Sequence, residues 1–381
     1  FLLIQIGTND HNLGNIIIIG GGLAGLVSGI LLRRKGIPCL LIEKKSYPLH
    51  RVCGEYVSNE ALPFLKGHRL YPEKFSPPHI DEFVLSSVTG KVSTMKLDLG
   101  GFGISRFSLD FFLYEIAKEC GVEFLLDTEA NSVRFEHDRF TVETTKGSFE
   151  GNVVIGAQGK RSRLDVSLRR SFVEKRSPYV GVKYHARNDH PVNQVALHNF
   201  EGGYCGINRV EDGVSNICYL TERETLREQG SIQALEQNIL YRNPRLKDIF
   251  VNSDFLFAKP EVINEISFET KGPIENHVLM AGDAAGMIAP LCGNGMAIAI
   301  HSAKIAADII PLFLQKKISR HAMELRYTHE WTKNFSARLW RGRKIQNLFG
   351  NRSLSAAAVN LVLYSKPLAR FLVQKTHGEP F

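Results

Sequence analysis

Cysteine is scarce in this chain, and none of it falls into a metal-binding pattern. The 381 residues include six cysteines, and no two of them form a C-x-x-C pair. Three of the six lie in apolar or strand-like contexts, which is typical of reduced thiols in a cytoplasmic protein. No group of His, Cys and carboxylate residues has metal-ligand spacing. We therefore expect a cytoplasmic protein with free thiols and no metal site.

Long apolar runs are missing as well. No uninterrupted apolar stretch reaches the ~18 residues of a membrane-spanning helix, so no segment is expected to cross a bilayer. The first residues lack the basic start and the small-residue cleavage site of a signal peptide. We interpret residues 1–13 as a peripheral extension or a fragment boundary without a function. With 44% hydrophobic and 23% charged residues, the chain should form two domains, or one large domain with an insertion.

Acidic residues are nearly absent from the C-terminal segment. Residues 331–381 contain nine Lys and Arg but one acid, Glu379, and they account for the whole net charge of +8. One interpretation is an amphipathic patch that contacts anionic lipid. Its members would be Arg338, Leu339, Trp340, Arg341, Arg343, Lys344, Ile345, Leu348 and Phe349. The other interpretation, which we favour, is a solvated helix face packed on the rest of the protein. No recognition fold accompanies the charge, so nucleic acid is not an expected partner.

A strand, a glycine-rich turn and a helix stand near the N-terminus. Four consecutive isoleucines at residues 16–19 predict a strand buried on both faces. This strand runs into a G-x-G-x-x-G formed by Gly20, Gly22 and Gly25, and helical apolar spacing follows. A second strand over residues 39–42 ends on Glu43, which lies 18 residues after the third glycine. The order of strand, glycine-rich turn, helix, second strand and acidic residue predicts a dinucleotide-binding unit.

Each part of this unit has a physical task. Gly20 makes the tight turn, Gly22 lets a pyrophosphate approach the backbone, and Gly25 lets the helix pack against the strand. The helix N-terminus offers free N–H groups and a partial positive charge to the phosphates. Glu43 is placed to accept hydrogen bonds from the adenosine ribose and would repel a 2′-phosphate. The motif alone leaves the choice between FAD and NAD open.

Two further strand-and-loop units lie far along the chain. Residues 152–156 run into a glycine-marked turn, and residues 277–281 run into the loop 282–296 and an alanine-rich helix. Before both units, an amphipathic helix is predicted over residues 108–119 with Ser108 as its N-cap. Alternation over residues 80–98 predicts a hairpin, and residues 178–260 should be β-rich with one helix near residues 232–241.

These three units in this order resemble the flavoproteins with the p-hydroxybenzoate hydroxylase fold. That superfamily includes single-component flavin monooxygenases, ubiquinone-biosynthesis hydroxylases, geranylgeranyl reductases and flavin-dependent halogenases. The resemblance covers about residues 14–330 and implies an α/β fold: a Rossmann-like FAD-binding domain with an inserted β-sheet-rich substrate domain and a helical C-terminus. The implied boundaries are 14–78, 105–168 and 265–330 for the FAD-binding domain, 79–104 and 169–264 for the substrate domain, and 331–381 for the C-terminal helical segment.

The resemblance implies a set of contacts with non-covalently bound FAD. Asp283, in a Gly-Asp motif, matches a residue that binds the ribityl chain, and Arg51 and Arg106 match arginines that contact the cofactor. Ala130 matches a position beside the adenine. Residues 290–296 match a loop that presents N–H groups at a helix N-terminus to the flavin N1–C2=O edge. The full expected set is Gly20, Gly22, Leu23, Ala24, Gly25, Glu43, Lys44, Arg51, Arg106, Ala130, Gly282, Asp283, Pro290, Gly293, Asn294, Gly295 and Met296.

The chain departs from the monooxygenase pattern at two places. Monooxygenases of this group usually carry Asp-Gly at the middle motif and a histidine after Gly-Asp-Ala-Ala, whereas this chain has Gln158-Gly159 and Gly286. The halogenase motif W-x-W-x-I-P is absent, which argues against halogenation. Of the reductase motif Y-x-W-x-F-P, only Tyr204 is kept, and a core role for this tyrosine is as plausible as a place in the substrate cavity.

We expect an NAD(P)H-dependent flavin monooxygenase that hydroxylates or epoxidises an apolar or aromatic small molecule with O2. The alternative is a flavin-dependent double-bond reductase acting on a prenyl or polyene substrate, which Gly286 and the stretch Cys53-Gly54-Glu55 favour. A third interpretation, a non-catalytic FAD-dependent regulatory protein, is disfavoured because the flavin-edge loop is intact.

The catalytic residues stay unassigned, because no acid–base or nucleophilic constellation is evident and the flavin would carry the chemistry. No second nucleotide fold is expected, so NAD(P)H should bind transiently as the reductant, or another carrier should reduce the flavin. We expect the protein in the cytoplasm, and peripheral to a membrane if the basic C-terminal segment contacts lipid.

Overall fold

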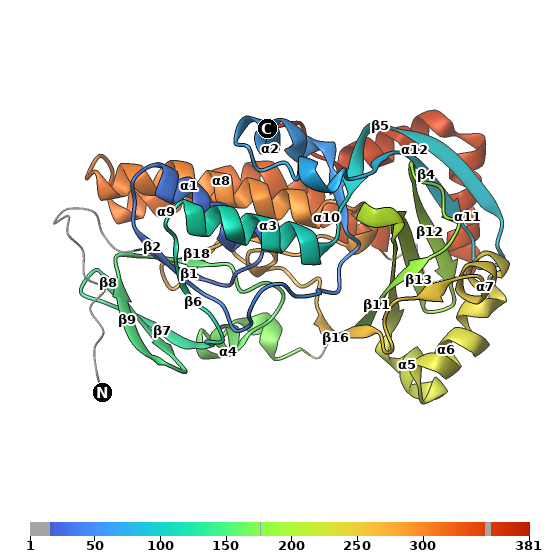
Figure 1. Ribbon diagram of the computed structural model, residues 1–381, viewed down its shortest axis with the longest axis horizontal. Helices are drawn as coiled ribbons and strands as arrows, with labels where there is room; N and C mark the ends of the chain where they lie inside the picture. The colour runs from blue at the N-terminus through green and yellow to red at the C-terminus, as the bar shows by residue number, and fades with distance from the viewer. Residues whose placement is uncertain (1–15, 176, 347–351) are drawn as a thin grey trace.

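The computed structural model describes residues 16–175, 177–346 and 352–381. Two sheets organise the chain, and they lie in opposite halves of an elongated molecule (Figure 1). Residues 1–13, expected to be a peripheral extension, and Leu348 and Phe349, expected in the basic C-terminal patch, lie outside the described residues. The α/β fold class is confirmed.

The first half contains a six-stranded sheet with the predicted isoleucine strand in its middle. Its strand order is β17 (Ile274–Glu275), β18 (Val278–Met280), β10 (Val153–Gly156), β1 (Ile16–Ile19), β2 (Cys39–Ile42) and β6 (Glu123–Leu125). β1 pairs in parallel with both β10 and β2, and its four isoleucines are at most 4% exposed. The unbroken apolar run is explained by this position, because both faces of β1 are covered.

Helices cover one face of this sheet, and a small sheet lies on the other side (Figure 1). The helices are α1 (Leu23–Arg34), α3 (Arg106–Glu119), α8 (Gly295–Leu314) and α9 (Arg320–Trp331), and the small sheet consists of β7 (Ala130–Glu136), β8 (Arg139–Thr144) and β9 (Gly147–Gly151). Among the described residues, α8 alone is long and apolar enough to cross a bilayer, but 61% of its apolar stretch is buried inside the protein. It packs between α1 and α9, as a core helix does.

The second half contains a nine-stranded sheet. It runs in the order β15 (Asp254–Phe255), β11 (Tyr179–Arg187), β14 (Ser215–Glu222), β13 (Gly203–Arg209), β12 (Gln194–Phe200), β4 (His79–Ser86), β5 (Val92–Gly103) and β3 (Tyr56–Ser58), with β16 (Glu261–Ile266) also paired to β11. The predicted hairpin is confirmed as β4 and β5. β3 belongs to this sheet although the predicted boundaries place it in the FAD-binding domain; those boundaries stay a prediction.

Two helix predictions are wrong in detail. The N-cap of α3 is Ser105, not Ser108, because the Ser105 side chain accepts the N–H of Ser108. The β-rich region has the predicted helix, α6 (Ile232–Asn238), and two more that were not predicted, α5 (Arg223–Gln229) and α7 (Pro244–Val251). α5 and α7 are only seven and eight residues long, so their apolar periodicity is too short to stand out from the sequence.

The remaining helical elements are short or C-terminal. They are α2 (Leu62–Gly67), α4 (Arg163–Ser167), a π-helical turn (Thr332–Ser336), α10 (Ala337–Gln346), α11 (Arg352–Tyr364), α12 (Lys366–Thr376), and 3-10 turns at Asn59–Ala61, Glu73–Phe75, Ser171–Val173, Glu211–Gly213, Leu240–Arg242, Gly282–Ala284 and Pro290–Cys292.

The C-terminal segment joins the two halves of the molecule. α10 carries Arg338 into the interior, where its guanidinium pairs with the Glu60 carboxylate at 2.7 Å. α11 packs against β5, and the ring of the last residue, Phe381, stacks on His301 of α8. The lipid patch suggested from the sequence is therefore wrong for Arg338 and Leu339, which are buried.

Candidate cofactor and substrate site

A cavity of about 700 Å³ lies where the two halves meet. It is lined by the ends of β1 and β2, by the loops that follow β2, β10 and β18, and by one face of the nine-stranded sheet. Of the residues expected to contact FAD, all but Gly25 and Asn294 line this cavity. The structure therefore brings the predicted set to one place, while the contact assigned to each residue stays a prediction.

The three glycines of the first loop differ in what surrounds them. A Cβ at Gly20 would lie 2.3 Å from the carbonyl oxygen of Ala157, and a Cβ at Gly25 would lie 1.9 Å from that of Gly20. These two positions allow close packing of backbone on backbone. A Cβ at Gly22 would find as its nearest atom an Arg106 guanidinium nitrogen, 3.7 Å away. Gly22 thus opens onto the cavity, as a glycine that admits a pyrophosphate should.

The N-terminus of α1 is free of side-chain caps. Its N-cap residue is Gly22, which makes no side-chain hydrogen bond, and Leu23 and Ala24 of the first turn line the cavity. The first N–H groups of a helix have no partner inside the helix, and they carry partial positive charge. This end of α1 can therefore hold an anionic group.

Glu43 stands at the carboxyl end of β2 and is 4% exposed. Its carboxylate accepts hydrogen bonds from the backbone N–H groups of Gly21 at 2.6 Å and Lys45 at 3.1 Å. Both oxygens are fixed at the cavity wall, beside Lys44 and on the same wall as Ala130, the first residue of β7. A fixed carboxylate in this position is suited to accept hydrogen bonds from ribose hydroxyls.

Asp110 was not singled out from the sequence, yet it orients both predicted arginines. Its carboxylate is buried and accepts hydrogen bonds from Arg106 at 2.6 and 2.7 Å and from Arg51 at 2.9 Å. Burial would lower the pKa of Arg106, but the Asp110 carboxylate raises it, so the guanidinium stays charged. Because α3 begins at Arg106 and not after Ser108, Arg106 and Asp110 have the i, i+4 spacing of a helical ion pair, and this spacing is the signal that a correct helix start would have given.

Glu55 is a second residue of the site that was not expected there from the sequence. It is fully buried, and its carboxylate contacts the Lys183 ammonium, the His185 ring at 2.6 Å and the N–H of Arg106 at 2.7 Å. Burial alone would raise the pKa of Glu55, but the charge of Lys183 and the hydrogen bond of His185 lower it to about 2. Since Lys183 and His185 belong to β11, this ion pair ties the loop after β2 to the nine-stranded sheet.

The loop before α8 forms the opposite wall of the cavity. Gly282 and Gly293 have φ values of +60° and +68°, which other residues rarely adopt. The N-cap residue of α8, Asn294, makes no cap hydrogen bond; its side chain instead donates to the carbonyl oxygen of Thr376 at 2.6 Å. The first turn of α8 therefore also presents uncapped N–H groups to the cavity, and the C-terminal tail holds the loop in place.

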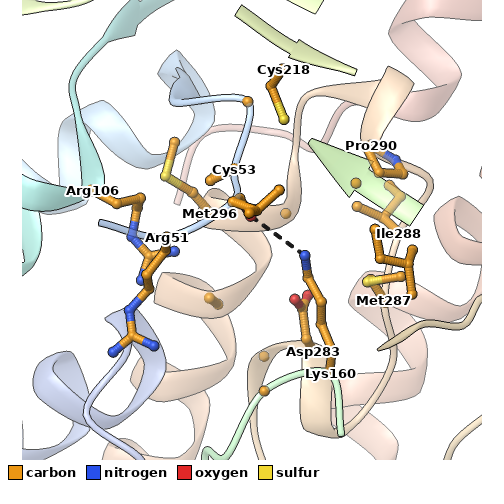
Figure 2. A pocket seen from close by; sticks show the side chains of 18 of the residues that line it. Arg51, Cys53, Arg106, Lys160, Cys218, Asp283, Met287, Ile288, Pro290 and Met296 are labelled. Carbon is orange, nitrogen blue, oxygen red and sulfur yellow. Dashed lines mark hydrogen bonds between the residues drawn. The ribbon is translucent and has the colours of Figure 1, made fainter. Parts of the chain in front are cut away.

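Charged and apolar side chains are separated inside the cavity. Figure 2 shows Arg51 and Arg106 on one side, Met287, Ile288 and Pro290 on the other, and Lys160 and Asp283 close together between them.

Lys271 is a further residue that was not found from the sequence. Its ammonium donates to the carbonyl oxygens of Lys160 at 2.7 Å and Asp283 at 3.0 Å.

Three thiols line the cavity, those of Cys53, Cys218 and Cys292. Burial raises the pKa of Cys218 and of Cys292 to about 12, so both thiols stay protonated at neutral pH. Neither Cys218 nor Cys292 is suited to act as a nucleophile.

The far end of the cavity is apolar. It extends between the nine-stranded sheet and helices α11 and α12, and we call this part the apolar arm. Its walls include Phe83, Leu85, Met95, Leu197, Leu220, Ile266, Met287, Leu361, Val362 and Val373. Tyr204 lines the arm too and is 3% exposed, so it is a buried sheet residue and a cavity residue at once.

The residues of the polar end fit a flavin dinucleotide. Two uncapped helix N-termini, of α1 and α8, face one cavity, and they suit a diphosphate and the N1–C2=O edge of a flavin respectively. The Tyr56 hydroxyl and the Gln158 side-chain oxygen are buried at this cavity without a hydrogen-bond partner among the described residues. A polar ligand would supply the partners that such atoms require.

Comparison with known proteins agrees with this geometry. A family model described as an FAD binding domain matches residues 14–333. Digeranylgeranylglycerophospholipid reductase 2 of Methanothermobacter thermautotrophicus is 24% identical, over 90% of this chain and 90% of its own. Menaquinone reductase of Mycobacterium tuberculosis is 24% identical, over 78% of this chain and 76% of its own.

Solved structures share the fold. A geranylgeranyl bacteriochlorophyll reductase-like protein of Thermoplasma acidophilum superposes with a TM-score of 0.78 at 17% identity, covering 96% of each chain. PqsL of Pseudomonas aeruginosa, named as a probable FAD-dependent monooxygenase, has a TM-score of 0.72 at 19% identity, covering 91% of this chain and 99% of its own. The chain belongs to the FAD binding domain family and is an FAD-dependent oxidoreductase with the p-hydroxybenzoate hydroxylase fold.

Proposed function

We propose that this protein is a flavin-dependent reductase of carbon–carbon double bonds in a long apolar substrate of the prenyl or polyene type. The observation that carries the proposal is the apolar arm, which continues from the loop before α8 to α11 and α12. A substrate that fills the arm needs a long hydrocarbon part, because the burial of apolar surface against these walls is what makes binding favourable. Sequence departures at Gly286 and at residues 53–55 point the same way.

The residues of the cavity have distinct tasks in this reaction. FAD, when bound and reduced by NAD(P)H, would supply a hydride to one carbon of the double bond, and a proton taken up from solvent would complete the second C–H bond. The uncapped N-terminus of α8 would be placed to stabilise negative charge at the flavin N1–C2=O edge. The arm excludes water and aligns the hydrocarbon chain, which keeps the reduced cofactor from unproductive reactions. The protonated Cys218 and Cys292 thiols add no negative charge there.

Gly286 has a structural reason in this chain. A Cβ at Gly286 would lie 2.8 Å from a methyl group of Leu339 and 3.2 Å from the Trp331 ring. The glycine therefore allows the C-terminal helices to close over the loop before α8. In this arrangement α10 packs on Pro290–Cys292, and Ile345 of α10 lines the cavity.

The curated relatives support a reductase. Two of them are named as reductases, of menaquinone and of digeranylgeranylglycerophospholipids, and both names describe molecules with long isoprenoid chains. We propose NAD(P)H as the transient reductant, because the cavity accounts for one nucleotide. The free cysteines favour a reducing, cytoplasmic compartment.

A monooxygenase is the second candidate. The likeness to PqsL, which covers 91% of this chain, and the apolar arm are both compatible with an aromatic substrate that is hydroxylated or epoxidised with O2. Gln158 argues against it, because monooxygenases of the superfamily usually carry an aspartate there.

The two candidates differ in whether oxygen is consumed. The FAD-loaded protein is reduced under nitrogen and mixed with an anaerobic solution of a polyprenyl compound, and the flavin absorption is followed. If the protein is a reductase, the compound reoxidises the flavin without oxygen. If the flavin stays reduced until oxygen is admitted, and oxygen uptake then rises with the compound, the monooxygenase is correct and the proposal is overturned.

A further inference from the structure

Helix α11 exposes a stripe of apolar side chains. Leu354, Ala357, Leu361 and Tyr364 recur at the three- and four-residue spacing that places them on one face of the helix. Tyr364 is 81% exposed and Leu354 is 42% exposed, whereas Val359 on the other side is fully buried. α11 thus has apolar residues on both sides, and among residues 353–364 its exposed polar side chains, Ser353 and Asn360, carry no charge.

Helix α12 continues this surface. Leu368 and Phe371, three residues apart, are 46% and 51% exposed, and Lys375 follows one turn later. The two helices pack against each other and follow one another in the chain (Figure 1). We call Leu354, Ala357, Leu361, Tyr364, Leu368 and Phe371 the α11–α12 face. Five of the twelve exposed large hydrophobic residues of the described chain lie on α10, α11 and α12.

Lysines stand over the exposed aromatic rings of these helices. The ammonium of Lys91 lies 5.6 Å from the centre of the Tyr364 ring, and that of Lys375 lies 5.2 Å from the centre of the Phe371 ring. Between Arg352 and Thr376 the sequence has four basic residues and no acidic one. Aromatic rings with basic side chains beside them are the composition of a helix that lies at the interface of an anionic bilayer.

The same face reaches the apolar arm. Leu361 is half-buried and lines the cavity, and so do Ala358 and Val362 of α11 and Val373 of α12. These two helices are therefore the wall between the arm and the exposed surface. A hydrocarbon chain that leaves a bilayer at this face would pass Leu361 and enter the arm.

We infer that the α11–α12 face docks on a membrane surface rich in anionic phospholipid, and that lipophilic substrate enters the cavity between these helices. The exposed apolar side chains insert among the headgroups, and the lysines contact the lipid phosphates. The docking rests on exposure and charge, so it stands whether the flavin chemistry is a reduction or an oxygenation, whereas the entry route rests on the proposed lipophilic substrate.

Vesicle binding tests the docking directly. The FAD-loaded protein is sedimented with vesicles of phosphatidylcholine, or of phosphatidylcholine and phosphatidylglycerol in equal amounts, at low ionic strength. We expect binding to the anionic vesicles, weakened by added salt because salt screens the lysines. The double variant Tyr364→Ser/Phe371→Ser and the double variant Lys91→Glu/Lys375→Glu should each bind about tenfold more weakly.

Matched controls distinguish binding through the α11–α12 face from nonspecific binding to vesicles. Val192→Ser/Val251→Ser removes two apolar side chains elsewhere that are 60% and 62% exposed, between the values of Phe371 and Tyr364. Lys316→Glu/Lys317→Glu reverses two exposed lysines just after α8. Both controls should bind as the parent does. No binding of the parent protein to anionic vesicles would overturn the inference, as would equal losses in the controls, and a protein partner would then be the occupant to seek.

A fluorescence measurement reports insertion at a single site. The chain has two tryptophans, of which Trp331 is 4% exposed and Trp340 is 56% exposed. In the variant Trp340→Phe/Phe371→Trp, the new indole replaces an exposed ring on α12. Its emission should shift to shorter wavelength with anionic vesicles and be quenched by brominated lipid chains. Unchanged emission while the protein sediments with the vesicles would show that another face binds them.

Discussion

Gly22 and Gly25 belong to one motif but have different neighbours. A Cβ at Gly25 would overlap the carbonyl oxygen of Gly20, whereas a Cβ at Gly22 would meet the cavity. The sequence pattern predicts both roles, because the spacing of the glycines is typical of this loop. The pattern does not predict that Arg106, from another part of the chain, lies opposite Gly22.

The two glycines therefore give a matched pair of substitutions. Gly22→Ala should leave the stability of the flavin-free protein within about 1 kcal/mol but weaken FAD binding at least tenfold, since the methyl group occupies the approach of the pyrophosphate. Gly25→Ala should instead lower the free energy of unfolding by about 1–3 kcal/mol through overpacking. Thermal unfolding and flavin titration of both variants check this; the reverse pattern would contradict the assigned approach.

Glu55 predicts a response to acid. Its pKa of about 2 in the folded protein lies below the ordinary value of 4.5, so its ionised form stabilises the fold above about pH 4.5. That stabilisation, about 3 kcal/mol from the size of the shift, is lost as the pH falls from 4.5 toward 2. At pH 7, Glu55→Gln should cost about 3–5 kcal/mol, because Lys183 stays buried without a counter-charge.

Urea unfolding of the parent and of Glu55→Gln across this pH range measures the effect. The variant should lose less stability than the parent as the pH falls, because it has no carboxylate to protonate at this position. Equal slopes for the two proteins would show that Glu55 is not held ionised by its neighbours.

Elements with strong periodicity could be predicted from the sequence, and short or distant ones could not. β1, α1, β2 and the β4–β5 hairpin follow from their apolar patterns and turn residues. α5 and α7 are too short for a clear period, and the pattern does not mark Ser105 as a cap because the apolar spacing begins later. The burial of Arg338 could not be inferred, since its partner Glu60 is 278 residues away.

The C-terminal tail is the element whose role was least visible in the sequence. Phe381 stacks on His301 with ring centres 3.9 Å apart and lies 5.6 Å from Phe64, and its N–H donates to the carbonyl oxygen of Glu60. A few residues earlier, Thr376 accepts the side chain of Asn294 from the loop before α8. The tail thus fixes one wall of the cavity.

Removing the Phe381 ring should loosen that wall. Phe381→Ala should lower the free energy of unfolding by about 1–3 kcal/mol and weaken FAD binding, because the partly buried ring packs on α8. Tyr364→Ala, at an 81% exposed ring, should change stability by less than about 0.5 kcal/mol. Denaturant titration and flavin titration of the two variants check this, and equal effects would refute a specific role for the tail.

At the scale of the whole molecule, the cavity forms where the six-stranded and nine-stranded sheets meet. The polar end could be predicted because three motifs of known spacing end there. The apolar arm could not, because its walls come from β4, β5, β12, β14, β16, α11 and α12, and no local pattern says that these segments face one another. Long-range packing decides this, and it also decides which helices close the arm.

Filling the arm separates substrate binding from cofactor binding. Leu197 of β12 lines the arm and is 7% exposed, so Leu197→Trp places an indole in the space expected for the hydrocarbon chain. The variant should bind FAD as the parent does but reduce long polyprenyl compounds at least tenfold more slowly. Val192→Trp, at a 60% exposed position, should behave as the parent in a steady-state assay. An unchanged rate for Leu197→Trp would show that the substrate lies elsewhere.

The mass of the product from a single anaerobic turnover tests the central claim most directly. The FAD-loaded protein is reduced by one equivalent of dithionite under nitrogen and given one equivalent of a polyprenyl compound, and the organic phase is analysed by mass spectrometry. A double-bond reductase returns the compound with two hydrogen atoms added. An unchanged compound under nitrogen, together with a product carrying one added oxygen atom once air is admitted, would contradict the proposed reduction.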